Sequence, residues 1–132
     1  MDGEILAQHR VESASRDGKE FLEVTLWGDV SYEMVVALFI ELNAHARQDA
    51  RLRILIDETR LKPALMGYRE IRKVVEFWRT MPGLRIARIA VVAPNLVLYG
   101  LNRMFALMAN EEGFNVFIAR GNATAWLLME PG

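Results

Sequence analysis

The spacing of apolar and polar positions changes along the chain and predicts a different element in each segment. Residues 86–92 are almost continuously apolar, as is typical of a strand covered on both faces of a parallel sheet. A long apolar helical pattern follows over 95–112, then a short apolar run at 115–119 and a segment at 123–128. This part of the chain is therefore predicted to run strand, helix, strand, helix.

The N-terminal residues follow the two-residue alternation of strands. Residues 5–12 and 19–27 both tend to alternate, and Arg16-Asp17-Gly18 between them supplies turn chemistry, which predicts a hairpin. Ser31 is a suitable cap for a helix ending near Asp49. The apolar face of that helix consists of Val35, Leu38, Phe39 and Leu42.

The middle of the chain predicts a third strand and a second helix. Residues 52–57 form a short buried strand, and Pro63 is placed in the first turn of a helix that runs to about Met81. That helix has one apolar face and one conspicuously basic face. The helix over 95–112 is apolar most of the way round, so we expect it to be covered on more than one side. The predicted fold class is α/β, with about five strands and about four helices.

Size and composition narrow the class of protein. At 132 residues without cysteine, the chain is predicted to be a single domain spanning 1–132 that needs no disulfide. Its acidic first residues and short apolar runs predict a cytoplasmic protein with no stable membrane insertion.

The net charge of −1 conceals an uneven distribution. Residues 1–58 carry 6 basic and 12 acidic side chains, whereas residues 60–88 carry 8 and 2. We interpret the basic stretch as a solvated helix face, so no nucleic-acid partner is expected.

Candidate chemistry is sparse. The sequence has no phosphate-binding glycine loop and no nucleophile elbow. His9 and His45 have no neighbours at metal-ligand spacing, and no nucleophile, general base and orienting group can be named together. We therefore expect no catalytic residues, no metal and no cofactor. Asp57-Glu58 follows the third predicted strand at the edge where open α/β sheets bind ligands. The structural alternative, which we favour, is that Asp57 accepts backbone N–H groups in a turn.

Apolar strand and helix patterns follow one another over residues 21–24, Gly28, 54–57, 88–93, 116–117 and 125–127. Their order and spacing, over most of the chain, resemble the SpoIIAA-like proteins, relatives of the STAS domains. The resemblance implies a β/α superhelix with a mixed, mainly parallel sheet, in a bacterial cytosolic protein with no known catalytic site. Anti-sigma-factor antagonists of this kind carry a phosphorylated serine where the second helix begins. The similar stretch here is Ala64-Leu65-Met66-Gly67, in which Leu65 and Met66 stand where the serines would be. The phosphorylatable serine is therefore lacking.

Other SpoIIAA-like proteins are thought to carry nonpolar molecules between mobile helices, and this similarity guides our functional hypothesis. We expect a non-enzymatic module that binds a small apolar molecule or lipid between its second and third helices, with Tyr68, Asn102 and Arg103 available as polar groups. The alternative is a STAS-type module that docks a partner protein or a second copy of itself. We expect the chain to form a homodimer in either case. The residues expected to line the ligand site are Met66, Tyr68, Trp78, Leu101, Met104, Phe105 and Met108.

Overall fold

The computed structural model describes residues 8–45, 52–63, 66–81, 86–110 and 112–129. A five-stranded sheet with the order β1-β2-β3-β4-β5 forms its centre, and β1 alone runs antiparallel to its neighbour. The elements are β1 (His9–Arg16), β2 (Lys19–Asp29), α1 (Tyr32–His45), β3 (Leu52–Lys62), α2 (Tyr68–Arg79), β4 (Ile86–Val92), α3 (Leu96–Ala109), β5 (Phe114–Phe117) and α4 (Arg120–Leu127). The predicted fold class is confirmed. Among the described residues, no helix is long and apolar enough to cross a bilayer.

Local sequence signals account for several boundaries. Asp17 and Gly18 both adopt positive φ, 54° and 78°, as a tight two-residue hairpin turn requires. Ser31 accepts a hydrogen bond from the Met34 backbone N–H at 3.1 Å, which confirms it as the cap of α1. Asn95 does the same for α3, accepting from Val97 and Leu98.

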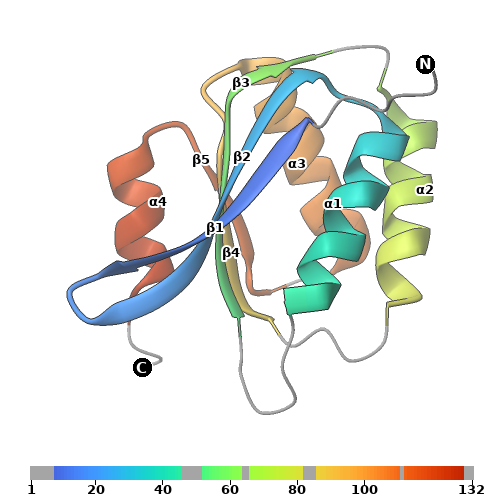
Figure 1. The fold of residues 1–132 in the computed structure, drawn as a ribbon. Coiled ribbons are helices and arrows are strands. Elements are labelled where there is room, and N and C mark those ends of the chain that lie inside the picture. Colours follow the sequence, from blue (N-terminus) through green and yellow to red (C-terminus); the bar gives the residue numbers. More distant parts are fainter. Residues whose placement is uncertain (1–7, 46–51, 64–65, 82–85, 111, 130–132) are drawn as a thin grey trace, which may run out of the picture.

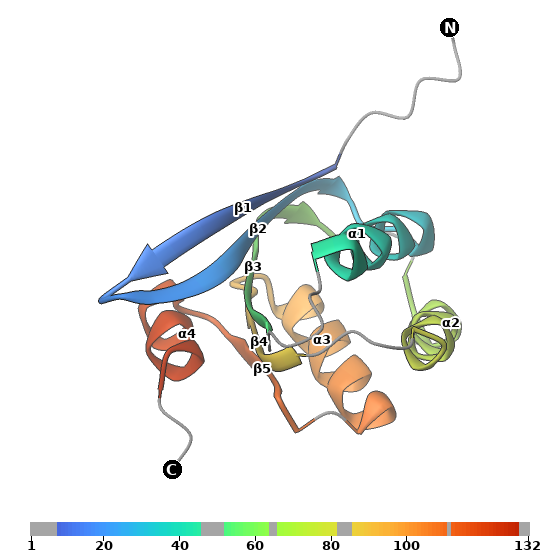
Figure 2. The ribbon, with the colours of Figure 1, turned by 60° about the horizontal axis from the view of Figure 1, so that its bottom comes forward.

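The helices divide unequally between the two faces of the sheet. Figures 1 and 2 show α1, α2 and α3 on one face and α4 on the other. Side chains therefore alternate along the strands between two cores, with Ile54 and Ile56 facing the three helices and Leu55 facing α4. This double coverage explains why the sequence of β4 is apolar at consecutive positions.

Helix α2 lies farther from the sheet than α1 and α3 do (Figure 2), and it contacts both of them. Its buried side chains Ile71, Val74 and Val75 belong to the core that the three helices share with the sheet. Trp78 packs edge-on against Phe39 of α1 and Phe105 of α3, with ring centroids 5.1 and 5.9 Å apart. Helix α2 thus covers the groove between α1 and α3.

Two predicted boundaries around α2 are wrong. Strand β3 continues beyond Asp57 to Lys62, because its last residues pair with the end of β2. Pro63 is not in a helix. Helix α2 begins at Tyr68 instead, after Gly67, whose backbone N–H donates to Glu70 Oε1 at 2.8 Å. The predicted end of α1 near Asp49 lies outside the described residues.

The outer face of α3 is less covered than its apolar sequence predicts. Leu98 and Phe105 are buried, but Leu96, Val97 and Leu107 are 74%, 57% and 76% exposed. The sheet and α2 cover only part of the helix. An apolar surface therefore remains on the outside of α3.

Candidate ligand-binding cavity

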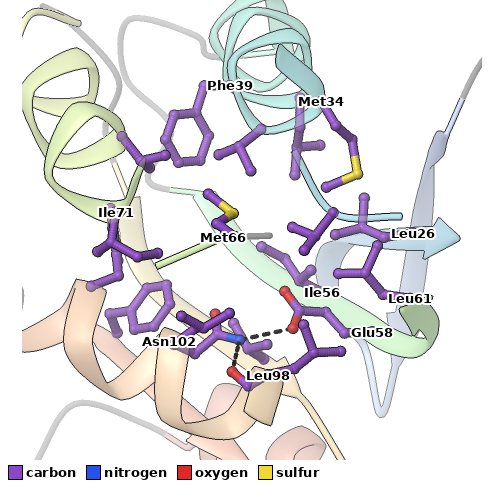
Figure 3. A pocket seen from close by; sticks show the side chains of 18 residues that line it. Leu26, Met34, Phe39, Ile56, Glu58, Leu61, Met66, Ile71, Leu98 and Asn102 are labelled. Atoms are coloured by element: carbon purple, nitrogen blue, oxygen red, sulfur yellow. Dashed lines mark hydrogen bonds between the residues drawn. The ribbon is translucent and has the colours of Figure 1, made fainter. Parts of the chain in front are cut away.

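A cavity of about 80 Å³ lies between the sheet and the three helices of one face (Figure 3). Its lining comes from strands β2, β3, β4 and β5, from helices α1, α2 and α3, and from Val30 and Met66, which precede α1 and α2. Of the 18 described residues that line it, only Glu58 and Asn102 are polar; the others are Leu26, Val30, Met34, Val35, Leu38, Phe39, Ile56, Leu61, Met66, Ile71, Val74, Val91, Leu98, Leu101, Phe105 and Phe114.

Glu58 faces this cavity because of its position in β3. It follows Ile54 and Ile56 at the two-residue period of a strand, so its side chain points to the same face of the sheet. The register with β2 shifts directly afterwards, since Thr25 pairs with Asp57 but Trp27 pairs with Arg60. This bulge in β3 leaves Glu58 between two regular stretches of the strand pairing, and β4 pairs no farther than Asp57.

The carboxyl group of Glu58 is buried, with 8% of the residue exposed. Burial disfavours its charged form and raises its pKa from 4.5 to about 7, with a smaller upward contribution from the negative charge of Asp57. The hydrogen bond from Asn102 opposes this change. Glu58 is therefore partly ionised near neutral pH.

Asn102 holds one oxygen of that carboxyl group. Its Nδ2 donates to Glu58 Oε1 at 2.8 Å and to the backbone oxygen of Leu98 at 2.9 Å, as Figure 3 shows. Because the Leu98 carbonyl can only accept, the amide nitrogen must face it, which fixes the orientation of the side chain. Both Nδ2 hydrogens are thereby used.

The residues predicted to line a ligand site are divided by the structure. Met66, Leu101 and Phe105 line the cavity. Trp78, Met104 and Met108 are half-buried and pack against the same core without lining the cavity, and Tyr68 is 57% exposed at the start of α2. Of the polar residues considered, Asn102 reaches the cavity. Arg103 is exposed elsewhere on α3 and does not line it.

The sequence contained a signal for Glu58 that the predicted end of the strand obscured. The alternation of Ile54 and Ile56 extends to Glu58, but a strand ending at Asp57 placed both carboxylates in a loop. A longer strand would have placed the two carboxylates on opposite faces, as the structure does.

Asp57 points to the α4 face and has a structural role. It accepts the Thr59 backbone N–H at 2.8 Å, which confirms the predicted acceptor role, but the contact lies within β3 and not in the predicted turn. Asp57 also lies 3.2 Å from Arg120 Nη1. Arg120 also reaches Glu23 at 2.6 Å and so ties α4 to two strands. In the part of the chain that the structure describes, no three acidic, histidine or cysteine residues cluster as metal ligands.

No protein-family model matches this chain, and no curated protein matches it in sequence. Its structure is similar to the crystal structure of an uncharacterized DUF3478-family protein with a SpoIIAA-like fold from Shewanella loihica PV-4. The two share 18% sequence identity with a TM-score of 0.65, over 95% of this chain and 98% of the other. This protein therefore has the SpoIIAA-like fold that its sequence predicted.

Proposed function

We propose that this protein is a non-enzymatic binding module that takes a small apolar molecule into the cavity between the sheet and helices α1, α2 and α3. The observation that carries the proposal is the composition of the lining, in which 16 of 18 residues are apolar and two adjacent polar side chains form one corner. Apolar walls with few convergent polar groups are typical of small-molecule sites. The site residues that follow from this geometry are Met66, Leu101 and Phe105 from the sequence prediction, with Glu58 and Asn102.

The size of the cavity limits what it accepts without rearrangement. Its volume of about 80 Å³ is roughly half of the ~150 Å³ of an engineered cavity that binds benzene. A ring-sized ligand therefore requires some outward movement of α2, the helix farthest from the sheet. A ligand that fills this volume would gain van der Waals contacts with the apolar lining.

Two neighbouring valines on α2 allow a matched test. Val74 and Val75 are both buried, at 3% and 2% exposed, but only Val74 lines the cavity. We expect Val74→Phe to fill the cavity and abolish binding of benzene. Val75→Leu crowds the core next to it and costs about 1–3 kcal/mol of stability, but should leave benzene binding intact.

Methyl NMR provides the measurement for this pair. Titration of the wild-type protein with benzene should shift the methyl signals of Val74, Leu98 and Leu101, all of which line the cavity. Binding should also raise the melting temperature, because the ligand binds the folded state. Methyl signals that do not move at millimolar benzene, or that move equally in the Val74→Phe variant, would rule the cavity out as a binding site.

The exposed surface of α3 supports a second candidate, a protein-interaction module. Leu96 and Leu107 are eleven residues apart, three turns of helix, and therefore lie on one stripe, which Gly100 and the exposed side chain of Arg103 share. Such a stripe offers apolar contacts and a close approach for another helix. We propose a second copy of this chain as its partner, because symmetric dimers are the commonest soluble oligomers.

A further inference from the structure

The polar corner of the cavity presents hydrogen-bond acceptors and has no N–H group to spare. Asn102 uses both Nδ2 hydrogens, on Glu58 Oε1 and on the Leu98 carbonyl. Among the described residues, nothing donates to Glu58 Oε2 or to Asn102 Oδ1. Figure 3 shows the Glu58 carboxyl group directed among the apolar lining side chains.

We propose that the cavity selects an apolar molecule that carries one hydrogen-bond-donating head, a hydroxyl or an amine, and that Glu58 accepts the hydrogen bond from this head. The inference rests on the proposed function, since it names the class of ligand for the same cavity. Asn102 is a positioning residue in this arrangement. Its bond to Glu58 Oε1 holds the carboxyl group, while Oε2 is left for the ligand.

The chemistry of the corner also excludes other heads. A carboxylate head would place a second negative charge beside Glu58 in surroundings of low dielectric, where like charges repel strongly. A wholly apolar ligand would displace solvent from the free oxygen of Glu58 without replacing it as a hydrogen-bond partner, which costs free energy. Fatty-acid anions and pure hydrocarbons should therefore bind more weakly than alcohols or amines with the same apolar body.

Four probes with a common ring test this selection. Phenol and aniline carry a donor, fluorobenzene has nearly the shape of phenol without a donor, and benzoate carries an anionic head. Binding is followed by methyl NMR at pH 8, where Glu58 is mostly ionised. We expect phenol and aniline to bind at least about tenfold more tightly than fluorobenzene, because a hydrogen bond to a charged group is at stake. Benzoate should bind more weakly than fluorobenzene.

The variant Glu58→Leu provides the control. It replaces a buried carboxyl group by an apolar side chain, which such sites commonly tolerate, and Asn102 retains its bond to the Leu98 carbonyl. In this variant the preference for phenol and aniline over fluorobenzene should disappear, while fluorobenzene still binds.

The outcomes separate this inference from the proposed function. Tight binding of fluorobenzene with no preference for phenol or aniline overturns the role of Glu58 and leaves the apolar cavity in place. Benzoate binding as tightly as phenol has the same meaning, as does a preference that survives in Glu58→Leu. Failure of all four probes to bind overturns the proposed function itself.

Discussion

Glu58 occupies a position where the alternation of β3 calls for an apolar side chain. Ile54 and Ile56 precede it on the same face, and Leu61 returns to that face after the bulge. A carboxyl group at such a position lowers stability whenever it is ionised, since burial disfavours the charge. The raised pKa of Glu58 reflects the same cost, because burial makes the ionised form less stable than it is in water.

The sign of the resulting pH dependence follows from the two pKa values. Below about pH 4.5 Glu58 is protonated in both the folded and the unfolded chain and contributes nothing to the dependence. Between pH 4.5 and about 7 the unfolded chain releases this proton and the folded chain retains it. The contribution of Glu58 to the free energy of unfolding therefore falls by about 3 kcal/mol as pH rises through this window. Above the window this contribution is constant.

We predict that Glu58→Gln removes this part of the pH dependence. The free energy of unfolding of the variant, minus that of the wild-type protein, should increase by about 3 kcal/mol between pH 4.5 and pH 8. Urea denaturation of both proteins at each pH measures this difference, and other titrating groups cancel in the comparison. A difference that stays constant over this range would contradict the burial of an ionisable Glu58.

Asn102 and burial act on the pKa of Glu58 in opposite directions. The amide of Asn102 stabilises the ionised carboxylate and lowers the pKa of Glu58. We predict that Asn102→Leu raises this pKa further above 7, because burial then acts without the opposing hydrogen bond. The carboxyl carbon of Glu58, followed by NMR against pH, reports the midpoint directly. An unchanged or lower midpoint would mean that Asn102 does not hold the carboxylate.

At the scale of elements, α2 depends on two other helices for its place. Trp78 contacts aromatic rings on both of them, Phe39 on α1 and Phe105 on α3. We predict that Trp78→Ala lowers the free energy of unfolding by about 3 kcal/mol, through lost burial and lost ring contacts. Tyr68→Ala on the same helix should change it by less than about 0.5 kcal/mol, since Tyr68 is exposed. Chemical denaturation measures both, and equal losses would show that the aromatic contacts do not anchor α2.

The elements themselves were predictable where one physical signal decided them. The apolar run of β4, the cap at Ser31 and the Asp17-Gly18 turn each specify local geometry with little help from distant residues. The extension of β3 was not predictable in this way, because its polar end is held by pairing with β2. The predicted start of α2 was wrong for a related reason. Pro63 suits the first turn of a helix, but here it directly follows the extended strand β3.

The cavity was predicted only in part, because a helical face does not reveal what covers it. The sequence placed Met66, Leu101 and Phe105 near a shared apolar space, and the structure does so too. Met104 and Met108 have the same apolar character as Leu101 but are turned toward other parts of the core. Their positions depend on the rotation of α3 against the sheet, which no local spacing determines.

At the scale of the whole molecule, several exposed basic side chains lie on α2 and several exposed apolar side chains lie on α3, where Arg103 is also exposed. The basic side chains of α2, Arg69, Arg72, Lys73 and Arg79, are exposed, as the sequence predicted. The largest exposed apolar side chains include Leu96 and Leu107, which lie on the neighbouring helix α3. An association driven by the α3 stripe would respond to salt differently from one driven by charge, because ions screen charge but do not weaken apolar burial.

The stripe on α3 leads to a test of self-association. If two copies meet through Leu96, Gly100 and Leu107, then Leu107→Lys places a cation in each half of a symmetric interface, four residues from the cation of Arg103. We predict that the wild-type protein is a dimer by light scattering at micromolar concentration, and that Leu107→Lys is a monomer. Ile40→Lys provides the matched control, because Ile40 is 59% exposed on α1, away from the stripe. Raising the salt concentration should leave the wild-type dimer intact. A wild-type monomer, or a dimer that persists in Leu107→Lys, would contradict association through this face of α3.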